Sequence, residues 1–494
     1  MMYVSTRGDG EKINSAKAII KGIAEDKGLY VPEEIPVIKE SLSSMAGRTY
    51  QEVAEYVIGL FFTDFTKDEI HRCVLNAYDE KFETEEIVPM AKIGRELPAY
   101  FLELYHGKTA AFKDMALSIL PHLLITAMGK EKEESQIAIL TATSGDTGKA
   151  ALEGFADVVG TQVIVFFPEE GVSAVQKAQM VTQTGDNTHV FAIRGNFDDA
   201  QSGVKRIFAD NEFAEDLQEK GFKLSSANSI NIGRLVPQVA YYVYAYLKLL
   251  EVGEVSEGEK INVAVPTGNF GNILAAYYAK QMGIPIGKLI CASNENKVLT
   301  DFINTGVYDI KRDFHLTNSP SMDILISSNL ERLLYHLSDN NSGEIKRLMK
   351  KLELDKSYEV SDKIRDKLKE FYADYADQQE TLATIRDMYE NNGYLIDTHT
   401  AVGYRVYMKY AEKTGDHTKT VIASTASPYK FANAVAQAIE LDQEIDDFQY
   451  IIGLYAETGI SVPEGLQNLD KKDVRHRSVI NIGQMKENVW NCLK

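Results

Sequence analysis

From residue 137 to residue 292, short apolar runs of strand length alternate with segments that have helical spacing. This alternation predicts βαβ units, because parallel strands need a crossover connection of helical length between them. A parallel sheet is buried on both faces, so its strands read as continuous apolar runs. The pattern resumes near the C-terminus and predicts an α/β fold. The predicted strands are 137–141, 163–168, 189–193, 261–265, 289–292 and 420–424, and the predicted helices are 149–157, 174–182, 198–211, 233–250, 272–282 and 430–439.

The remaining segments divide the chain further. Residues 1–95 are predicted to form a mainly helical N-terminal domain, with a helix over 49–62 and Thr66 as the N-cap of the next helix. Residues 96–494 form the α/β region, which includes a small lobe over about 135–205. Between about 325 and 392 the alternation stops. Charged residues with apolar residues at three-to-four spacing predict a helical insertion there, made of surface helices over 330–354, 360–375 and 378–389.

Composition excludes several classes of partner. The chain has 494 residues and a net charge of -19, which disfavours nucleic acid and anionic membrane as main partners. Cys73, Cys291 and Cys492 lie far apart and have no metal-ligand spacing, so we predict no metal site and a reducing compartment. The first residues lack the apolar core of a signal peptide, and no apolar run reaches membrane-spanning length. We therefore expect a cytoplasmic protein.

The most informative stretch for chemistry is 106–114, His-Gly-Lys-Thr-Ala-Ala-Phe-Lys-Asp. It follows an extended apolar run and precedes a helix that begins near Met115. A lysine at a helix N-terminus feels the positive end of the helix dipole, which favours the neutral amine that a Schiff-base lysine needs. Lys113 is the candidate, and the alternative is an ordinary charged residue at a helix start. Gly107-Lys108-Thr109 imitates a P-loop, but position 102 is Leu where that motif needs Gly, so we reject a nucleotide-triphosphatase or kinase.

Two loops follow predicted strands and open predicted helices. The run 267–272 is Thr-Gly-Asn-Phe-Gly-Asn, and the run 144–148 is Ser-Gly-Asp-Thr-Gly. Glycines let the backbone approach an anion, and N–H groups at a helix start bind phosphate oxygens. Neither loop has the G-x-G-x-x-G dinucleotide pattern. The alternatives are a plain strand–helix turn for the first loop and a simple N-cap for the second.

Two further runs carry polar side chains. Residues 226–234 place four polar side chains and Arg234 before a helix, and arginine suits bidentate phosphate recognition. The alternative is a polar loop with an exposed arginine. Thr425 follows the last strand, where a hydroxyl could hydrogen-bond a ring nitrogen without charging it. Because ligands of open parallel sheets bind beyond the carboxyl ends of strands, the loops 144–148, 266–272 and 425–428 are expected to share one crevice.

Together these runs resemble the threonine synthase family, whose members are pyridoxal-phosphate enzymes of the tryptophan-synthase-β-like fold. The likeness rests on 106–114, 144–148, 268–272 and 425–428. It also covers 3–8, 28–32, 319–323 and 397–401, in order across nearly the whole chain. The resemblance implies fold type II, with two open parallel-type sheets flanked by helices, a helical N-terminal domain and a helical insertion.

The resemblance also implies roles for single residues. Lys113 would bind pyridoxal 5'-phosphate and act as the catalytic residue. Thr425 would face the pyridine nitrogen, and Arg234 would hold the substrate's phosphate. Relatives often have His where this chain has Ser427, which removes any imidazole role at that position. The remaining cofactor-binding residues would be Gly268, Asn269, Phe270, Gly271 and Asn272, and the remaining substrate-binding residues Ser144, Thr147, Asn228 and Ser229.

The activity implied is that of a carbon–oxygen lyase acting on phosphates. It converts O-phospho-L-homoserine and water to L-threonine and phosphate by γ-elimination and β-addition of water, the last step of threonine biosynthesis. The partner would be this small substrate, in a monomer or homodimer. The alternatives are a serine or threonine dehydratase, another β-replacement enzyme of the same fold, and an inactive binding homologue. An intact Lys113 and phosphate loop argue against the last of these.

Overall fold

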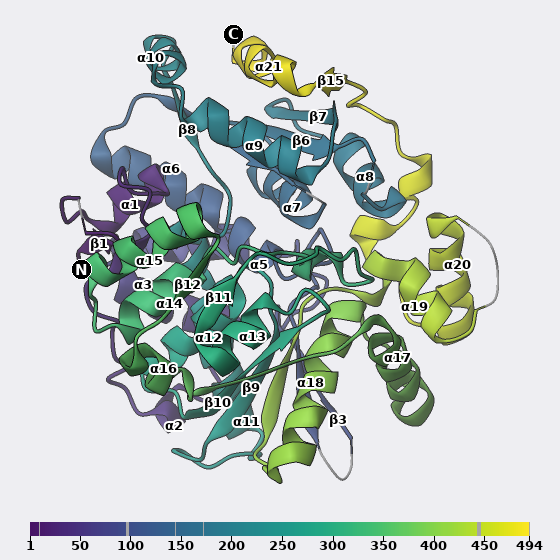
Figure 1. The fold of residues 1–494 in the computed structure, drawn as a ribbon. Coiled ribbons are helices and arrows are strands. Elements are labelled where there is room, and N and C mark those ends of the chain that lie inside the picture. The colour runs from purple at the N-terminus through teal and green to yellow at the C-terminus, as the bar shows by residue number, and fades with distance from the viewer. Residues whose placement is uncertain (9, 95–97, 144, 171, 442–445, 494) are drawn as a thin grey trace.

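The structure is a computed structural model that describes residues 1–8, 10–94, 98–143, 145–170, 172–441 and 446–493. Two sheets dominated by parallel strands organise it, each flanked by helices (Figure 1). The smaller sheet lies at the top of the view, together with the C-terminal segment. The short helix α5 (Asp114–Leu117) lies between the two sheets.

The larger sheet has the strand order β13-β10-β9-β14-β4-β3. All neighbouring pairs are parallel except β3 and β4. Its central strands are buried along their length, as the continuous apolar runs predict. The strands are β3 (Met90–Ile93), β4 (Ala99–Glu103), β9 (Ile261–Pro266), β10 (Ile286–Ser293), β13 (Phe371–Tyr375) and β14 (Thr420–Ser424).

The smaller sheet has the order β15-β7-β6-β5-β8, and all its pairs are parallel. The C-terminal strand β15 (Val479–Asn481) extends this sheet beyond β7, so the end of the chain returns to the lobe formed near its middle. The other strands are β5 (Gln136–Ala142), β6 (Thr161–Pro168), β7 (Thr188–Arg194) and β8 (Phe222–Ser225). The helices that flank this sheet are α7 (Asp146–Phe155), α8 (Ala174–Val181), α9 (Phe197–Phe208), α10 (Asn211–Glu219) and α21 (Met485–Cys492).

The N-terminal segment is built mainly of helices, and its α3 (Tyr50–Phe61) packs against α11 (Ile232–Glu251). Thr66 caps α4 (Lys67–Ala77) through a capping box with Glu69, as predicted. A two-stranded antiparallel pair precedes these helices. The remaining elements here are β1 (Tyr3–Ser5), α1 (Ser15–Lys21), β2 (Tyr30–Pro32) and α2 (Leu42–Met45). From the following region, α6 (Leu120–Glu131) packs against α1 and α4.

The prediction of helices alone over 325–392 is wrong at two points. Residues 371–375 form β13, which pairs in parallel with β10 at the edge of the larger sheet, and residues 357–359 form β12, which pairs with β11. The aromatic run Phe371-Tyr372 favours a strand, but the dense charge on either side masks that signal. The predicted helix 330–354 is also two helices. The elements are β11 (Val307–Asp309), α14 (Leu330–Leu337), α15 (Ser342–Asp355), β12 (Ser357–Glu359), α16 (Asp362–Leu368) and α17 (Gln378–Asn392).

Other helices and turns complete the two layers. Among the described residues, no helix is both long and apolar enough to cross a membrane. These remaining elements are α12 (Gly271–Gln281), α13 (Val298–Thr305), η1 (Pro320–Met322), α18 (Thr398–Thr414), η2 (Pro428–Phe431), α19 (Ala432–Ala438), α20 (Asp447–Thr458), η3 (Glu464–Leu466), η4 (Leu469–Lys471) and η5 (Ile482–Gln484).

Candidate active site

The loop that carries Lys113 is fixed by the turn after β14. The Phe112 N–H donates to the Thr425 carbonyl at 2.8 Å, and the Ser427 N–H donates to the Ala110 carbonyl at 3.0 Å. These bonds tie residues distant in sequence, because β4 and β14 are neighbours in the larger sheet. Thr425 is thereby held beside the residue that precedes Lys113.

The buried Asp114 side chain stabilises the same loop through hydrogen bonds. Its carboxylate accepts the Thr109 N–H at 2.7 Å and the Thr109 hydroxyl at 2.6 Å. A Cβ at Gly107 would lie 2.6 Å from the Asp114 side chain, so the loop closes only over glycine there. Burial raises the pKa of Asp114 to about 6, against the opposing effect of the Thr109 hydrogen bonds.

Lys113 itself is the N-cap residue of α5, and its side chain is largely buried, with 11 % of it exposed. Burial lowers the pKa of Lys113. The carboxylate of Asp146 opposes that shift, and the positive charges of Arg234 and Lys430 add to it. The sequence predicts a lowered pKa from the helix dipole, but α5 has four residues, and the structure assigns the shift first to burial. The amine is thus shifted toward the neutral form by the fold around it.

Asp146, the first residue of α7, joins four side chains. Its Oδ2 lies 3.3 Å from Lys113 Nζ and accepts the Ser321 hydroxyl at 3.0 Å. Its Oδ1 accepts the Gln176 amide at 2.8 Å and lies 3.2 Å from Lys430 Nζ. Burial alone would raise the pKa of this carboxyl, but the ammonium groups of Lys430 and Lys113 outweigh burial and hold the pKa well below its usual range. Asp146 is therefore a buried carboxylate shared by two lysines.

Lys430 is buried, with 1 % of its surface exposed. Besides Asp146, its ammonium donates to the Thr109 carbonyl at 2.7 Å and to Gln179 Oε1 at 2.9 Å. It therefore links the Lys113 loop to both α7 and α8. Asp146 and Lys430 were not predicted as site residues from the sequence. Two sequence features could have pointed to them: Asp146 is the single carboxylate in the otherwise neutral 144–148 loop, and Lys430 lies three residues after Ser427.

The 268–272 turn joins β9 to α12. Phe270 takes the left-handed conformation, with φ 63°, and Gly271 begins the helix, so backbone N–H groups face the turn. A Cβ at Gly268 would lie 2.8 Å from the Ser321 carbonyl, and Ser321 binds Asp146. Contacts thus run from the turn to Lys113 through Ser321 and Asp146. His399 fixes this link, since its Nε2 accepts the Ser321 N–H at 3.1 Å.

One buried donor in this turn is unsatisfied. Asn272 Oδ1 accepts the hydroxyls of Tyr241 and Tyr242, whereas Nδ2 has no hydrogen-bond partner among the described residues. A buried amide donor without a partner is costly, so a ligand oxygen near this turn would satisfy it. The turn and its orphaned donor fit a bound phosphate group.

The 226–234 segment brings Arg234 to the same region. Arg234 is 4 % exposed, and its guanidinium donates to the Ala227 carbonyl at 2.7 Å. Burial lowers the pKa of Arg234 to about 10. No carboxylate pairs with it in the part of the chain that the structure describes. A buried guanidinium without a counter-ion is suited to an anionic ligand.

Arg332 and Asn329 tie this segment to the turn. Asn329 Nδ2 donates to Ser229 Oγ and to the Asn269 carbonyl, each at 3.1 Å. Arg332 donates to the carbonyls of Ser229 and Ile230, and at 3.0 Å to that of Tyr30. Arg332 on α14 and Asn329 before it are buried but were not predicted from the sequence, because their segment has the charged pattern of a surface helix.

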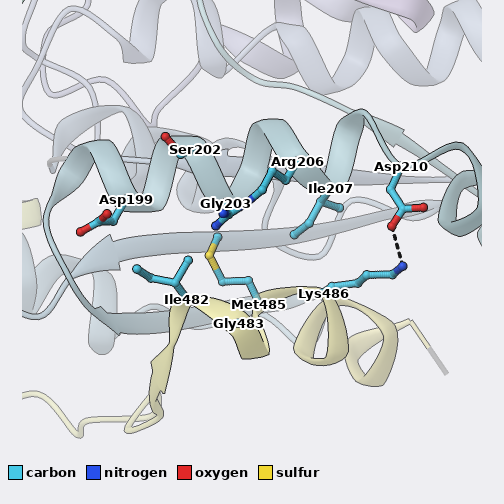
Figure 2. Close-up of a pocket in the computed structure, with 10 residues that line it drawn as sticks. All are labelled: Asp199, Ser202, Gly203, Arg206, Ile207, Asp210, Ile482, Gly483, Met485 and Lys486. Atoms are coloured by element: carbon cyan, nitrogen blue, oxygen red, sulfur yellow. Dashed lines mark hydrogen bonds and ion pairs between the residues drawn. The ribbon is translucent and has the colours of Figure 1, made fainter.

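The structure thus brings together the predicted residues Lys113, Thr425, Arg234, Ser229 and the 268–272 turn. Thr147 and Asn228 are half-buried, on the first turn of α7 and in the 226–231 loop. Ser144 lies outside the described residues. A cavity of about 550 Å³ between α9 and the C-terminal segment has none of these residues in its lining (Figure 2).

Comparison with known proteins places the chain in a family. Residues 85–426 match the family model for pyridoxal-phosphate-dependent enzymes, residues 2–78 the threonine synthase N terminus, and residues 400–488 the threonine synthase C-terminal model. Threonine synthase from Eremothecium gossypii is 35 % identical over 91 % of both chains. Human threonine synthase-like 1 is 42 % identical over 92 % of this chain, which spans 63 % of that relative's length.

A solved structure agrees with these matches. The crystal structure of pyridoxal-phosphate-bound threonine synthase from Brucella melitensis superimposes with a TM-score of 0.88 and 34 % identity, covering 100 % of both chains. The fold is thus that of type II pyridoxal-phosphate enzymes, with two parallel-dominated sheets flanked by helices, as predicted. The chain belongs to the threonine synthase family of pyridoxal-phosphate-dependent enzymes.

Proposed function

We propose that this chain is a threonine synthase, which uses pyridoxal 5'-phosphate to convert O-phospho-L-homoserine and water to L-threonine and phosphate. The observation that carries the proposal is that one site holds an amine of lowered pKa, that of Lys113, and a buried guanidinium, that of Arg234. Arg234 has no carboxylate partner among the described residues. The first suits carbonyl chemistry, and the second suits a phosphorylated substrate.

The residues present fit the cofactor. The backbone of Gly268 to Gly271 and the orphaned Nδ2 of Asn272 would hold its phosphate. Lys113 would bind its aldehyde carbon, and Thr425 would lie at the pyridine nitrogen. When bound, the cofactor supplies an electron sink that stabilises negative charge on the substrate carbons.

The chain's own residues would bind substrate and move protons. Arg234, with Ser229, Asn228, Thr147 and Ser144, would hold the substrate and its phosphate, and positive charge at Arg234 would favour departure of that phosphate from the γ-carbon. Lys113 Nζ, once free, would take the proton from the α-carbon, since burial disfavours its charged form. The resulting ammonium would form an ion pair with Asp146, whose Oδ2 lies 3.3 Å from Lys113 Nζ.

A product assay tests this proposal. The purified protein with pyridoxal phosphate should release phosphate and threonine from O-phosphohomoserine in equal amounts, and its visible spectrum should change when that substrate is added. Release of ammonia from serine or threonine, without threonine formation from O-phosphohomoserine, would show a dehydratase instead. A protein that stays colourless with pyridoxal phosphate would show a binding homologue.

A further inference from the structure

A second cavity has a volume of about 300 Å³ and is lined in part by Gln179. Lys430 contacts both Gln179 and Asp146, so this cavity is one side chain away from the Lys113 site. Its walls come from α7, α8, the loop after α8 and the C-terminal segment over 464–472. The C-terminal wall lies close to the Lys113 loop, because a Cβ at Gly465 would lie 1.9 Å from the Lys108 carbonyl oxygen. None of the residues assigned above to cofactor or substrate lines it.

Gln179, a wall residue of this cavity, carries a buried donor that is unsatisfied among the described residues. It lines the cavity wall and is 1 % exposed, and its Nε2 has no hydrogen-bond partner among the described residues. The orientation of the amide is fixed, because Lys430 only donates and must face Gln179 Oε1, which it does at 2.9 Å. The NH₂ group is therefore the part of the amide left for a ligand, and a ligand there must accept a hydrogen bond.

Positive charge surrounds that donor. Lys149 is 8 % exposed and donates to Glu153 at 2.7 Å and to Gln183 Oε1, which leaves one of its three N–H donors for the cavity. Lys108 and Lys472 are exposed at the rim. The acidic lining residues are Glu153, which Lys149 already binds, and exposed Glu464. An acceptor with negative charge is therefore the favoured occupant.

We propose that this cavity binds a small oxyanion, a phosphate or carboxylate group, with Gln179 Nε2 and Lys149 Nζ as its buried donors and Lys108 and Lys472 at its mouth. The site is separate from the one that Arg234 would form. It is also linked to that site, since Lys430 contacts both Gln179 and the Asp146 carboxylate. Occupancy of the cavity would thus be transmitted to Asp146 through one side chain.

The other cavity, between α9 and α21, has no buried unsatisfied side-chain donor in its lining among the described residues. There Lys486 already binds Asp210 at 2.5 Å, as Figure 2 shows. The other two charged lining residues, Arg206 and Asp199, have opposite signs, so the lining has no net positive charge to favour an anion.

Calorimetry with inorganic phosphate tests the site in the cofactor-loaded full chain at constant ionic strength. Gln179→Glu keeps an acceptor for Lys430 but replaces the free donor with a negative oxygen. We expect it to weaken binding at the cavity at least about tenfold, the size of one lost charge-assisted hydrogen bond. Gln201→Glu is the matched control, because Gln201 also accepts from a lysine on a helix, at 3.1 Å, and the change adds the same charge. It should leave phosphate binding unchanged.

A second variant and a direct measurement keep the test decisive if Gln179→Glu folds poorly. Lys472→Gln at the rim should weaken phosphate binding about threefold and reduce its salt dependence. Crystals soaked in selenate should show an anomalous peak within hydrogen-bond distance of Gln179 Nε2, and acetate in place of phosphate separates a carboxylate from a phosphate preference. Absence of that peak, or equal phosphate binding in wild type and Gln179→Glu, would overturn the proposal. Neither readout requires turnover, so failure here is distinct from failure of the proposed activity.

Discussion

Asp146 Oδ2 lies 3.3 Å from Lys113 Nζ, and the side chains of Asp146 and Lys113 are only 4 % and 11 % exposed. The two residues come from different parts of the fold, Lys113 from the loop before α5 and Asp146 from the start of α7 in the smaller sheet's lobe. Because the two groups lie so close, the carboxylate raises the pKa of the amine and the amine lowers the pKa of the carboxyl. Their contact also makes the geometry between the two lobes a determinant of the chemistry.

Asp146→Asn should destabilise the protein, because it leaves the ammonium of Lys430 buried without a carboxylate. Breaking a buried ion pair from one side costs about 3–5 kcal/mol. Lys430→Met in the same background removes the uncompensated charge and should restore about half of that loss, as measured by urea unfolding. Additive losses in the double variant would contradict the pairing of these two residues.

Lys113→Ala should abolish the visible absorbance of bound pyridoxal phosphate and reduce threonine formation together. Loss of a catalytic base alone lowers turnover by about 100- to 10,000-fold. Lys108→Ala, in the same loop but exposed, should retain the absorbance. Undiminished turnover in Lys113→Ala would remove the assignment of this lysine.

Gly154→Ala tests the distance between the lobes. A Cβ at Gly154 on α7 would lie 2.1 Å from the Leu117 carbonyl at the end of α5, so the variant must push α7 away from the helix that follows Lys113. We expect a loss of stability of about 2 kcal/mol or more and a clear loss of activity. Gly129→Ala, on α6 with nothing within 4 Å of its Cβ, is the control. It should be neutral or stabilising by up to about 1 kcal/mol.

Arg234→Met should separate binding from stability. The change removes a buried charge that has no carboxylate partner among the described residues, so urea unfolding should show little loss of stability or a gain. Steady-state kinetics should show a KM for O-phosphohomoserine raised at least about tenfold, the usual scale for a lost charge-assisted contact. A large loss of stability with an unchanged KM would mark Arg234 as a structural residue.

Asp114 should give the protein a distinct pH dependence. Its pKa is raised by burial to about 6, from 3.8, so between these values the folded state binds more protons than the unfolded state. The stabilising contribution is complete below about pH 4 and is lost as pH rises through 6. It amounts to about 3 kcal/mol at most, at about 1.4 kcal/mol for each pH unit.

Asp114→Asn isolates this effect, because Asn can accept the Thr109 N–H and donate to the Thr109 hydroxyl. Wild type should lose stability relative to the variant as pH rises from 4 to 6, measured by urea unfolding at each pH. Parallel pH profiles for the two proteins would show that Asp114 does not titrate in that range.

The chain's class and several of its candidate site residues could be predicted from local patterns. Continuous apolar runs predict strands, Thr66 predicts a helix start, and the 268–272 run predicts a turn before a helix. Each of these features depends on neighbours along the chain. The strand over 371–375 could not be predicted in this way. This segment forms a strand because it pairs with β10 at the edge of the sheet, although the charged sequence on either side favours helices.

Local sequence patterns were enough to predict the α/β class, most of the strands of the two sheets, the position of Lys113 before a helix, and the family. The contacts of Asp146 with both Lys113 and Lys430 became visible only in the folded chain. The same is true of Arg234, which is buried without a carboxylate among the described residues, and of the unsatisfied donor of Gln179. The physical reason is that burial and charge are properties of groups brought together from distant segments. A pKa or an unsatisfied hydrogen bond exists only once those segments have packed.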